Sequence, residues 1–334
     1  MASRDDVLSR DGAANLTAVD ATRPRPGALA LSVLATPLNF LVLRALSERP
    51  MRLAELRKAT GLPAQTTLRG HLTTLAEMGM LSKRPTERMP YAVENELTPM
   101  GRELLCVGQR LEAWLGQAPD GPISLEGAAA KGAVKALIDG WGSTMMRALA
   151  ARPQSLTELD SLISGLSYPA LERRLSSMRI AGLVEAQSSR GAGTPYAVTG
   201  WARRGIMPLA VASRCERRHM RGETTPVNQG DIEAAFMLAT PLVGLPAAAM
   251  GSCQLQVERR EGESAGVRVR VEGGRVVSCV SGLEPPPGAY VAGSVSSWFD
   301  AVDAGSIGPL RLGGGGRQLT EGLVLGLHTA LDLR

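Results

Sequence analysis

The sequence predicts a multidomain chain of 334 residues, with two mainly helical units of the same design followed by one α+β unit. The first observation is an internal repeat: residues 41–56 (LVLRALSERPMRLAEL) match residues 144–159 (TMMRALAARPQSLTEL) at an offset of 103. The second is charge, because residues 28–222 carry a net +9 (25 Lys and Arg against 16 Asp and Glu) and residues 223–334 a net −4 (8 against 12). The third is a strict alternation of apolar and polar residues in two runs after residue 250, which is typical of strands.

Each helical unit is expected to contain a helix, a short helix, a third helix, a two-stranded hairpin and a closing helix. In the first unit these elements are expected at residues 37–47, 53–60, 64–78, 81–97 and 100–114. In the second unit they are expected at residues 142–150, 156–163, 168–180, 183–198 and 202–218. This order is that of the winged helix-turn-helix.

The third helix of the first unit carries Leu68, Leu72 and Leu75 at the spacing of one apolar helix face. The side chains between them are short or forked hydrogen-bonding groups, which suit the DNA major groove, where Arg pairs with guanine and Gln with adenine. The alternative is an ordinary amphipathic helix with a solvated outer face, but the second copy of the pattern favours DNA. The candidate DNA-contacting residues of this unit are Gln65, Thr66, Thr67, Arg69, His71 and Thr73 on the helix, and Lys83, Arg84 and Arg88 in the hairpin.

The two copies are not expected to read DNA equally. Glu172 stands where the first copy has Arg69, and a carboxylate is unfavourable beside phosphate unless it accepts from a cytosine amino group. The match also shifts after the third helix: Tyr91-Ala92-Val93 pairs with Tyr196-Ala197-Val198 at an offset of 105, which predicts a longer second hairpin. The candidate DNA-contacting residues of the second unit are Tyr168, Glu172, Arg173, Ser176 and Arg190.

The segments RALSERPMRLAELRKATG, LRGHLTTLAEMGML and PYAVENELTPMGREL resemble the HxlR-type winged-helix regulators, a branch close to MarR. Taken as two units, the resemblance covers about two thirds of the chain. It implies a DNA-binding transcriptional regulator, and because single winged helices of this family act as dimers, a fused pseudo-dimer is expected here. The first copy lacks the family's Gly-Lys-Trp before its first helix, and neither copy has the early Cys of some redox-sensing relatives.

The third unit is expected to contain a helix from residue 231, four strands, a helix at 297–304 and a final helix at 319–331. Its segment GLEPPPGAYVAGSVSSWFDAVDAG resembles the sterol-carrier-protein type of lipid-binding domain. That resemblance implies a cavity between sheet and helices for an apolar small molecule, although the same side chains can simply fill a core. The candidate ligand-contacting residues are Phe236, Met237, Leu242, Tyr290, Trp298, Phe299 and Leu323.

The expected domain limits follow from turn clusters rich in Pro and Gly. They are a disordered arm at 1–27, winged-helix domains at 28–116 and 133–222, a linker at 117–132 and the sterol-carrier-like domain at 223–334. The arm ends in Arg23-Pro24-Arg25-Pro26, a composition that can enter a minor groove or form a plain flexible terminus.

Other classes of protein find little support in the sequence. The four Cys have no CxxC spacing and only three His are present, so neither a zinc site nor a cofactor is expected. The Gly run at 313–316 lacks the Lys-Ser/Thr of a phosphate loop, and no catalytic constellation is found, so an enzyme is not expected. The longest apolar stretch is interrupted by Pro241 and Pro246, and Asp5 and Asp6 precede any apolar run, so we expect a cytoplasmic protein without membrane insertion.

The sequence therefore predicts a DNA-binding transcriptional regulator with tandem winged helices and a C-terminal domain that senses an apolar small molecule. Its expected partner is double-stranded DNA, bound by a monomeric pseudo-dimer or by a homodimer. Two alternatives stay open. One is a constitutive DNA-binding protein whose C-terminal domain only dimerises, and the other is a lipid- or metabolite-binding protein whose winged helices are protein-docking modules.

Overall fold

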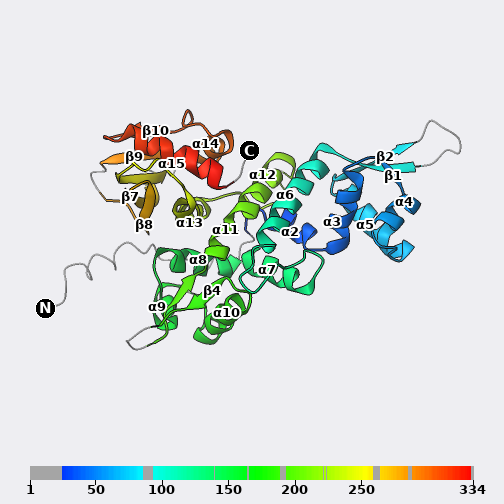
Figure 1. Cartoon of the computed structure of the whole chain (residues 1–334), viewed down its shortest axis with the longest axis horizontal. Helices are drawn as coiled ribbons and strands as arrows, with labels where there is room; N and C mark the ends of the chain where they lie inside the picture. The colour runs from blue at the N-terminus through cyan, green and yellow to red at the C-terminus, as the bar shows by residue number, and fades with distance from the viewer. Residues whose placement is uncertain are drawn as a thin grey trace. The chain divides into compact units, whose positions relative to one another are not determined.

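The computed structural model describes residues 25–85, 93–138, 140–163, 165–188, 193–220, 222, 224–258, 264–284 and 288–331 (Figure 1). These residues form two compact units. The N-terminal unit comprises Gly27–Lys135 and Val211–Thr224, and the C-terminal unit comprises Met1–Pro26, Ala136–Ala210 and Thr225–Arg334. The boundaries at 135 and 210 fall inside helices α7 (Ala128–Ile138) and α12 (Ile206–His219).

The N-terminal unit contains five helices of a helix-turn-helix region and a small antiparallel sheet of strand order β1-β3-β2. In chain order its elements are α2 (Ala28–Leu34), α3 (Pro37–Leu46), β1 (Met51–Arg52), α4 (Leu53–Ala59), α5 (Gln65–Glu77), β2 (Leu81–Pro85), β3 (Val93–Leu97) and α6 (Pro99–Leu115). The predicted apolar stripe of α5 is confirmed, because Leu68, Leu72 and Leu75 are all buried. Helix α5 packs against α3, α4 and β2, so this stripe fixes which face of α5 points outward.

The turn between α4 and α5 depends on two residues in the left-handed region, Gly61 (φ 82°) and Leu62 (φ 58°). The Leu62 N–H donates to the Arg57 carbonyl at 2.8 Å, which closes the end of α4, and Arg57 Nε donates to the Pro63 carbonyl at 2.9 Å. Leu62 itself is exposed. The turn is therefore held by one backbone hydrogen bond and one from the Arg57 side chain, without burial of Leu62.

The last part of α12 also belongs to the N-terminal unit. The buried carboxylate of Glu216 accepts hydrogen bonds from the N–H groups of Gly27 at 2.7 Å and Ala30 at 2.9 Å, at the start of α2. Burial raises the pKa of Glu216, and the backbone donors oppose this rise by stabilising the ionised form. On α6, Glu103 lies within 4 Å of Arg214 and Arg218, and its Oε2 is 2.8 Å from His219 Nε2.

The same order of elements recurs in the C-terminal unit. It contains α8 (Gly140–Ala151), α9 (Leu156–Leu162), α10 (Tyr168–Ile180), β4 (Val184–Ala186), β5 (Tyr196–Val198), α11 (Gly200–Arg204) and the start of α12. Helices α5 and α10 end in the same way, with Gly79 (φ 76°) and Gly182 (φ 72°) in the left-handed conformation. The following N–H groups, of Met80 and Leu183, each donate to a carbonyl five residues earlier at 2.9 Å.

The hairpins correct one prediction. Thr98 and Thr199 occupy the same place, since each N–H donates to the residue before the first strand and each hydroxyl caps the following helix. Their offset is 101 and not the predicted 105, so the second hairpin is two residues shorter than the first. The match of Tyr91-Ala92-Val93 to Tyr196-Ala197-Val198 was wrong because strand residues of similar type recur every two positions, so identity alone does not fix register.

The closing helix of the second copy is also divided. The sequence predicted one helix at 202–218, whereas α11 ends at Arg204 and α12 starts at Ile206. Pro208 has no N–H to donate to the Arg204 carbonyl, and its ring is incompatible with a continuous helix through that carbonyl. The break therefore falls at Gly205, directly after the Arg204 carbonyl that the proline leaves without a donor.

The C-terminal domain is a five-stranded sheet with all its helices on one face. Its elements are α13 (Gln229–Ala239), η1 (Thr240–Leu242), β6 (Gly251–Glu258), β7 (Ser264–Glu272), β8 (Arg275–Ser281), β9 (Ala289–Ser294), α14 (Val295–Ala304), β10 (Arg311–Gly313) and α15 (Arg317–Ala330). The strand order is β10-β9-β6-β7-β8, with β6 and β9 parallel and the other pairs antiparallel. Leu255, Val269 and Val291 are buried under the helices, whereas the residues that alternate with them, such as Arg268 and Arg270, lie on the open face.

Within the C-terminal unit, this domain packs on α8 and α11 through α13. Arg147 Nη1 of α8 lies 3.7 Å from the buried carboxylate of Glu233 on α13, which also accepts a hydrogen bond from Ser281. Arg203 of α11 donates to the Met237 carbonyl at 2.9 Å and to the Ala150 carbonyl at 3.0 Å. Desolvation at this contact lowers the pKa of Arg203.

The predicted arm lies mostly outside the described residues, apart from Arg25 to Gly27. Arg25 is buried, and its Nη1 donates to the Leu137 carbonyl at 3.1 Å. Desolvation lowers its pKa to about 10, while the negative charge of Asp231 acts in the opposite direction. Among the described residues, no single helix is long and apolar enough to cross a membrane. Helices α2 and α3 reach that length and apolar character only when taken together, and they are bent by 85° relative to each other.

Candidate nucleic-acid interface and ligand-binding residues

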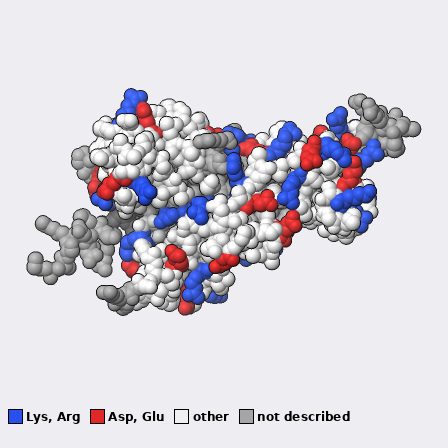
Figure 2. All heavy atoms as spheres, viewed as in Figure 1, with Lys and Arg blue, Asp and Glu red and all other residues white. Residues whose placement is uncertain are grey.

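The outer face of α5 carries five of the six predicted contact residues in exposed positions. These are Gln65, Thr66, Thr67, Arg69 and Thr73. Helix α5 begins after Ala64, whose methyl group cannot accept a hydrogen bond. The N–H groups of the first turn are therefore not capped by the N-cap side chain. Figure 2 shows Lys and Arg side chains over α4 and α5, where Arg57, Lys58 and Arg69 are exposed. A row of small polar side chains, uncapped N–H groups and basic residues is suited to phosphate and base contacts.

His71, the sixth predicted residue, makes a hydrogen bond within the N-terminal unit. It is half-buried, and its Nδ1 lies 2.7 Å from Asn39 Oδ1 on α3. Asn39 Nδ2 in turn donates to the Val33 carbonyl at 2.9 Å. This chain of hydrogen bonds joins α5 to α3 and positions the outer face of α5. The sequence reasoning missed Asn39, because a single Asn in an apolar helix gives no indication of its partner.

The hairpin places Lys83 and Arg84 on β2 with exposed side chains. Their acidic neighbours were not expected from the sequence. Glu94 lies opposite Arg84 in the β2–β3 register, and Glu96 accepts a hydrogen bond from Ser82 at 3.1 Å. Glu94 Oε1 also lies 3.9 Å from Arg52 Nε on β1. The described part of the hairpin is thus close to neutral. Arg88 lies outside the described residues.

Helix α10 presents a different surface. Its buried stripe is Leu171, Leu175 and Met178, as the offset of 103 predicted. Tyr168, Glu172 and Arg173 are exposed, with 45% of Tyr168 accessible, and Ser176 is half-buried. The outer face therefore mixes an aromatic ring, a negative and a positive charge. Arg190 lies outside the described residues.

Six of the seven predicted ligand-contacting residues lie on the helix-covered side of the C-terminal domain. Phe236, Met237, Trp298 and Leu323 are buried, and Leu242 and Phe299 are half-buried. The rings of Phe236 and Trp298 meet edge to face at 4.6 Å, and Trp298 Nε1 donates to the Gln256 carbonyl at 2.6 Å. Tyr290 is separate from this group: it neighbours Gln254 in the parallel β6–β9 pair and therefore shares the open face of the sheet.

Among the described residues, no group of three or more His, Cys, Asp or Glu is arranged to hold a metal ion. The four cysteines are free thiols, and only Cys106 is exposed. Burial raises the pKa of Cys215 and of Cys253 to about 12 and that of Cys279 to about 11. These three thiols are therefore poor nucleophiles near neutral pH.

Comparison with known protein families supports a helix-turn-helix in the first of the two copies. Residues 33–120, which include α3 to α6, match the family model described as HxlR-like helix-turn-helix. No curated protein matches the chain. The match supports an HxlR-type winged-helix regulator with DNA as its partner, since that family consists of DNA-binding regulators.

Proposed function

We propose that this protein is a transcriptional regulator that places α5 in the DNA major groove. The observation that carries the proposal is the exposed row of Gln65, Thr66, Thr67, Arg69 and Thr73, set by a buried Leu stripe within the segment that matches the HxlR-like family. In this arrangement Arg69 pairs with a guanine and Gln65 with an adenine, the pairings that their side-chain geometry favours. The uncapped first turn of α5 and the Lys83–Arg84 segment contact phosphates.

We further propose that residues 133–222 form a second winged helix and that the chain acts as a fused pseudo-dimer. The recurrence of the helix, hairpin and cap geometry supports this, as does the ion-paired contact between Glu103 on α6 and the end of α12. Because Glu172 replaces Arg69 on the outer face of the second reading helix, the two heads make unequal contacts with an imperfect inverted repeat.

Residues 223–334 are the proposed sensor domain of the regulator. Its support is the attachment of α13 to α8, the first helix of the second winged helix, through Arg147, Glu233 and Arg203. A ligand that shifts α13 changes the position of α8 and hence the second reading head, which is coupling between two distinct sites. In the constitutive alternative this domain only dimerises, and no small molecule alters DNA binding.

The test is an unbiased selection of duplexes from a random library by the intact chain. A regulator of the proposed kind enriches a motif with a guanine contacted by Arg69, and its specific affinity exceeds its non-specific affinity by about 10³ or more. The same selection with Arg69→Ala is expected to lose preference at one base pair, whereas Lys131→Ala, which removes one exposed charge from α7, leaves the motif unchanged. Failure to enrich any sequence would instead favour winged helices that dock proteins.

A further inference from the structure

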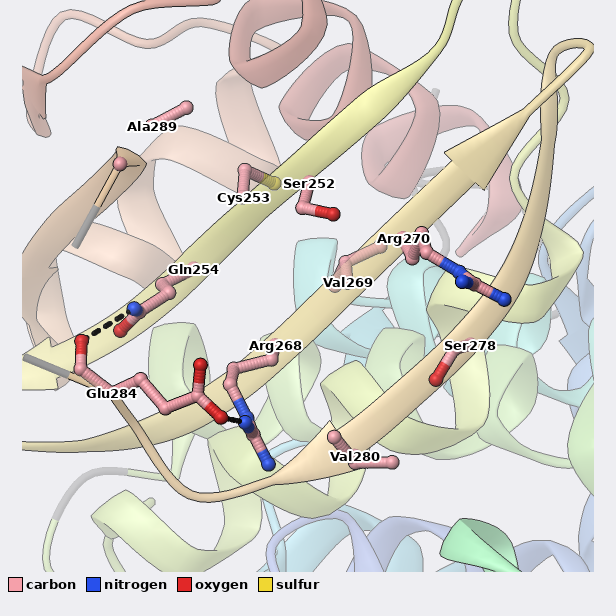
Figure 3. A pocket seen from close by; sticks show the side chains of 11 residues that line it. Ser252, Cys253, Gln254, Arg268, Val269, Arg270, Ser278, Val280, Glu284 and Ala289 are labelled. Atoms are coloured by element: carbon pink, nitrogen blue, oxygen red, sulfur yellow. Dashed lines mark hydrogen bonds and ion pairs between the residues drawn. The ribbon is translucent and has the colours of Figure 1, made fainter. Parts of the chain in front are cut away.

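The open face of the sheet in the C-terminal domain contains a hollow that the helices do not cover (Figure 3). Its volume is about 460 Å³, within the usual range for small-molecule pockets. It is formed by β6, β7 and β8, the start of β9, and Glu284 in the loop after β8. None of the seven residues predicted to contact an apolar ligand lines it.

The charge of this pocket is set by Arg268 and Arg270 on β7 and by Glu284. Figure 3 shows the Arg268 side chain directed at the Glu284 carboxylate, with which it forms an ion pair. Gln254 Nε2 donates to the Glu284 carbonyl at 2.8 Å and so ties Glu284 to β6. Arg268 Nε is buried and has no hydrogen-bond partner among the described residues. The lining thus holds two guanidinium groups and one carboxylate, and a second carboxylate outside the lining, that of Glu272, lies 3.4 Å from Arg270 Nε.

The remaining lining is mixed. Ser252 and Ser278 contribute hydroxyl groups, and Val280 and Ala289 contribute apolar surface. A ligand that matches this set carries a negative group for the arginines, hydrogen-bonding groups for the serines and a short aliphatic part. A wholly apolar ligand would leave the arginine and serine groups without partners, at a cost in free energy.

We propose that this pocket binds a small organic anion, with a carboxylate or phosphate group held by Arg268 and Arg270. Such a group accepts paired hydrogen bonds from a guanidinium in the geometry that Arg favours. Glu284 forms an ion pair with Arg268 and therefore competes with the anion for this guanidinium. Binding itself is independent of the DNA-binding role, and only its effect on DNA affinity rests on the proposed function.

The experiment is calorimetric titration of the intact chain, without DNA, with four anions and two neutral compounds of similar size. Succinate and citrate test carboxylates, and inorganic phosphate and glycerol 3-phosphate test phosphates. Succinamide and glycerol are the neutral controls. At least one anion is expected to bind saturably with a Kd below about 1 mM, and neither neutral compound is expected to bind.

Variants locate the binding. Arg268→Gln is expected to weaken binding about tenfold and the more exposed Arg270→Gln about threefold. Glu284→Gln is expected to tighten binding severalfold, because it removes the competing carboxylate. Arg275→Gln is the matched control, because this exposed arginine lies on β8 but does not line the pocket. Thermal melting of each variant checks that it is folded, and Arg270→Gln keeps the test valid if Arg268→Gln is unstable.

Three results would overturn the proposal: no saturable binding of any of the four anions, an affinity unchanged in both Arg268→Gln and Arg270→Gln, or no gain in Glu284→Gln. These readings do not depend on DNA. An anion that binds here while the chain selects no DNA sequence would refute the proposed function alone. A chain that selects DNA but binds no anion would refute this inference alone.

Discussion

At the scale of single residues, helices α5 and α10 carry opposite charges at one matched position. Arg69 on α5 and Glu172 on α10 are both exposed and follow a buried leucine, Leu68 or Leu171. A carboxylate beside the phosphate backbone weakens non-specific binding, because it opposes the cations that replace counterions. The apolar stripe of α10 marks its buried face, so the sequence alone predicts that Glu172 lies on the outer face.

We predict that Glu172→Ala strengthens binding to random duplex DNA by about two- to fivefold at low salt, because it removes a negative charge near phosphate. The measurement is a titration of a random duplex at several salt concentrations. Asp120→Ala, which removes an exposed charge outside α10, is the control and is expected to have little effect. Weakening confined to one half-site would identify Glu172 as a base-contacting residue, and no change would place α10 away from DNA.

At the scale of elements, the second helix of each copy starts in the same way. The Arg52 N–H donates to Glu55 at 2.8 Å, and the Ser155 N–H donates to Glu158 at 2.7 Å. An arginine three residues before each N–H donor, Arg49 or Arg152, pairs with the same carboxylate. The pKa of both Glu55 and Glu158 is lowered. The larger cause is the hydrogen bond from the backbone N–H, and the next is the hydrogen bond from the arginine side chain.

We predict that Glu158→Ala destabilises the C-terminal unit by about 0.5 kcal/mol at neutral pH, a small value because the carboxylate is partly exposed. The lowered pKa means that the stabilisation is present above the unfolded-state pKa of about 4.3 and is lost as the pH falls through the folded-state pKa. Urea unfolding at pH 7 and near pH 3 measures this. The difference from the parent protein is expected to be smaller at the lower pH, and an equal difference at both would contradict the capping role. Glu185→Ala, an exposed change on β4, is the control.

At the scale of the whole molecule, both copies of the helix-turn-helix pattern lie on one chain, and the end of α12 packs in the N-terminal unit. A dimer of single heads occupies two half-sites about 34 Å apart. A single chain with two helix-turn-helix copies can occupy both half-sites without a second chain. The net +9 of residues 28–222 also concentrates positive charge, which phosphate binding requires, in these two copies.

We predict one chain on the shortest DNA that retains full affinity. Native mass spectrometry of the complex with a selected duplex, shortened in steps, measures the number of chains directly. The duplex without the second half-site is the control and is expected to bind more weakly at the same stoichiometry. Two chains on the shortest duplex would contradict the fused pseudo-dimer.

Local patterns predicted local structure well, whereas contacts between distant residues were missed. The stripe of α5, the alternating strands β6 and β7 and the turn at Gly273–Gly274 follow from periodicity and turn chemistry, which act over a few residues. The His71–Asn39 contact and the ion pair between Arg268 and Glu284 in the pocket join residues far apart in sequence. The alternation in β6 and β7 places polar residues on one sheet face, but no local signal shows that Glu284 lines a hollow there.

The central claim is that α5 reads bases through Arg69. Its most direct test is titration of the intact chain and of Arg69→Ala against the selected duplex, against duplexes with single base changes in it, and against a random duplex. Arg69→Ala is expected to lose about 1–3 kcal/mol on the selected duplex, to discriminate less at one base pair, and to lose clearly less affinity on the random duplex, where only its charge matters. Lys131→Ala is expected to match the parent protein on the selected and altered duplexes. An Arg69→Ala affinity that is unchanged, or that falls equally on every sequence, would contradict base reading by α5.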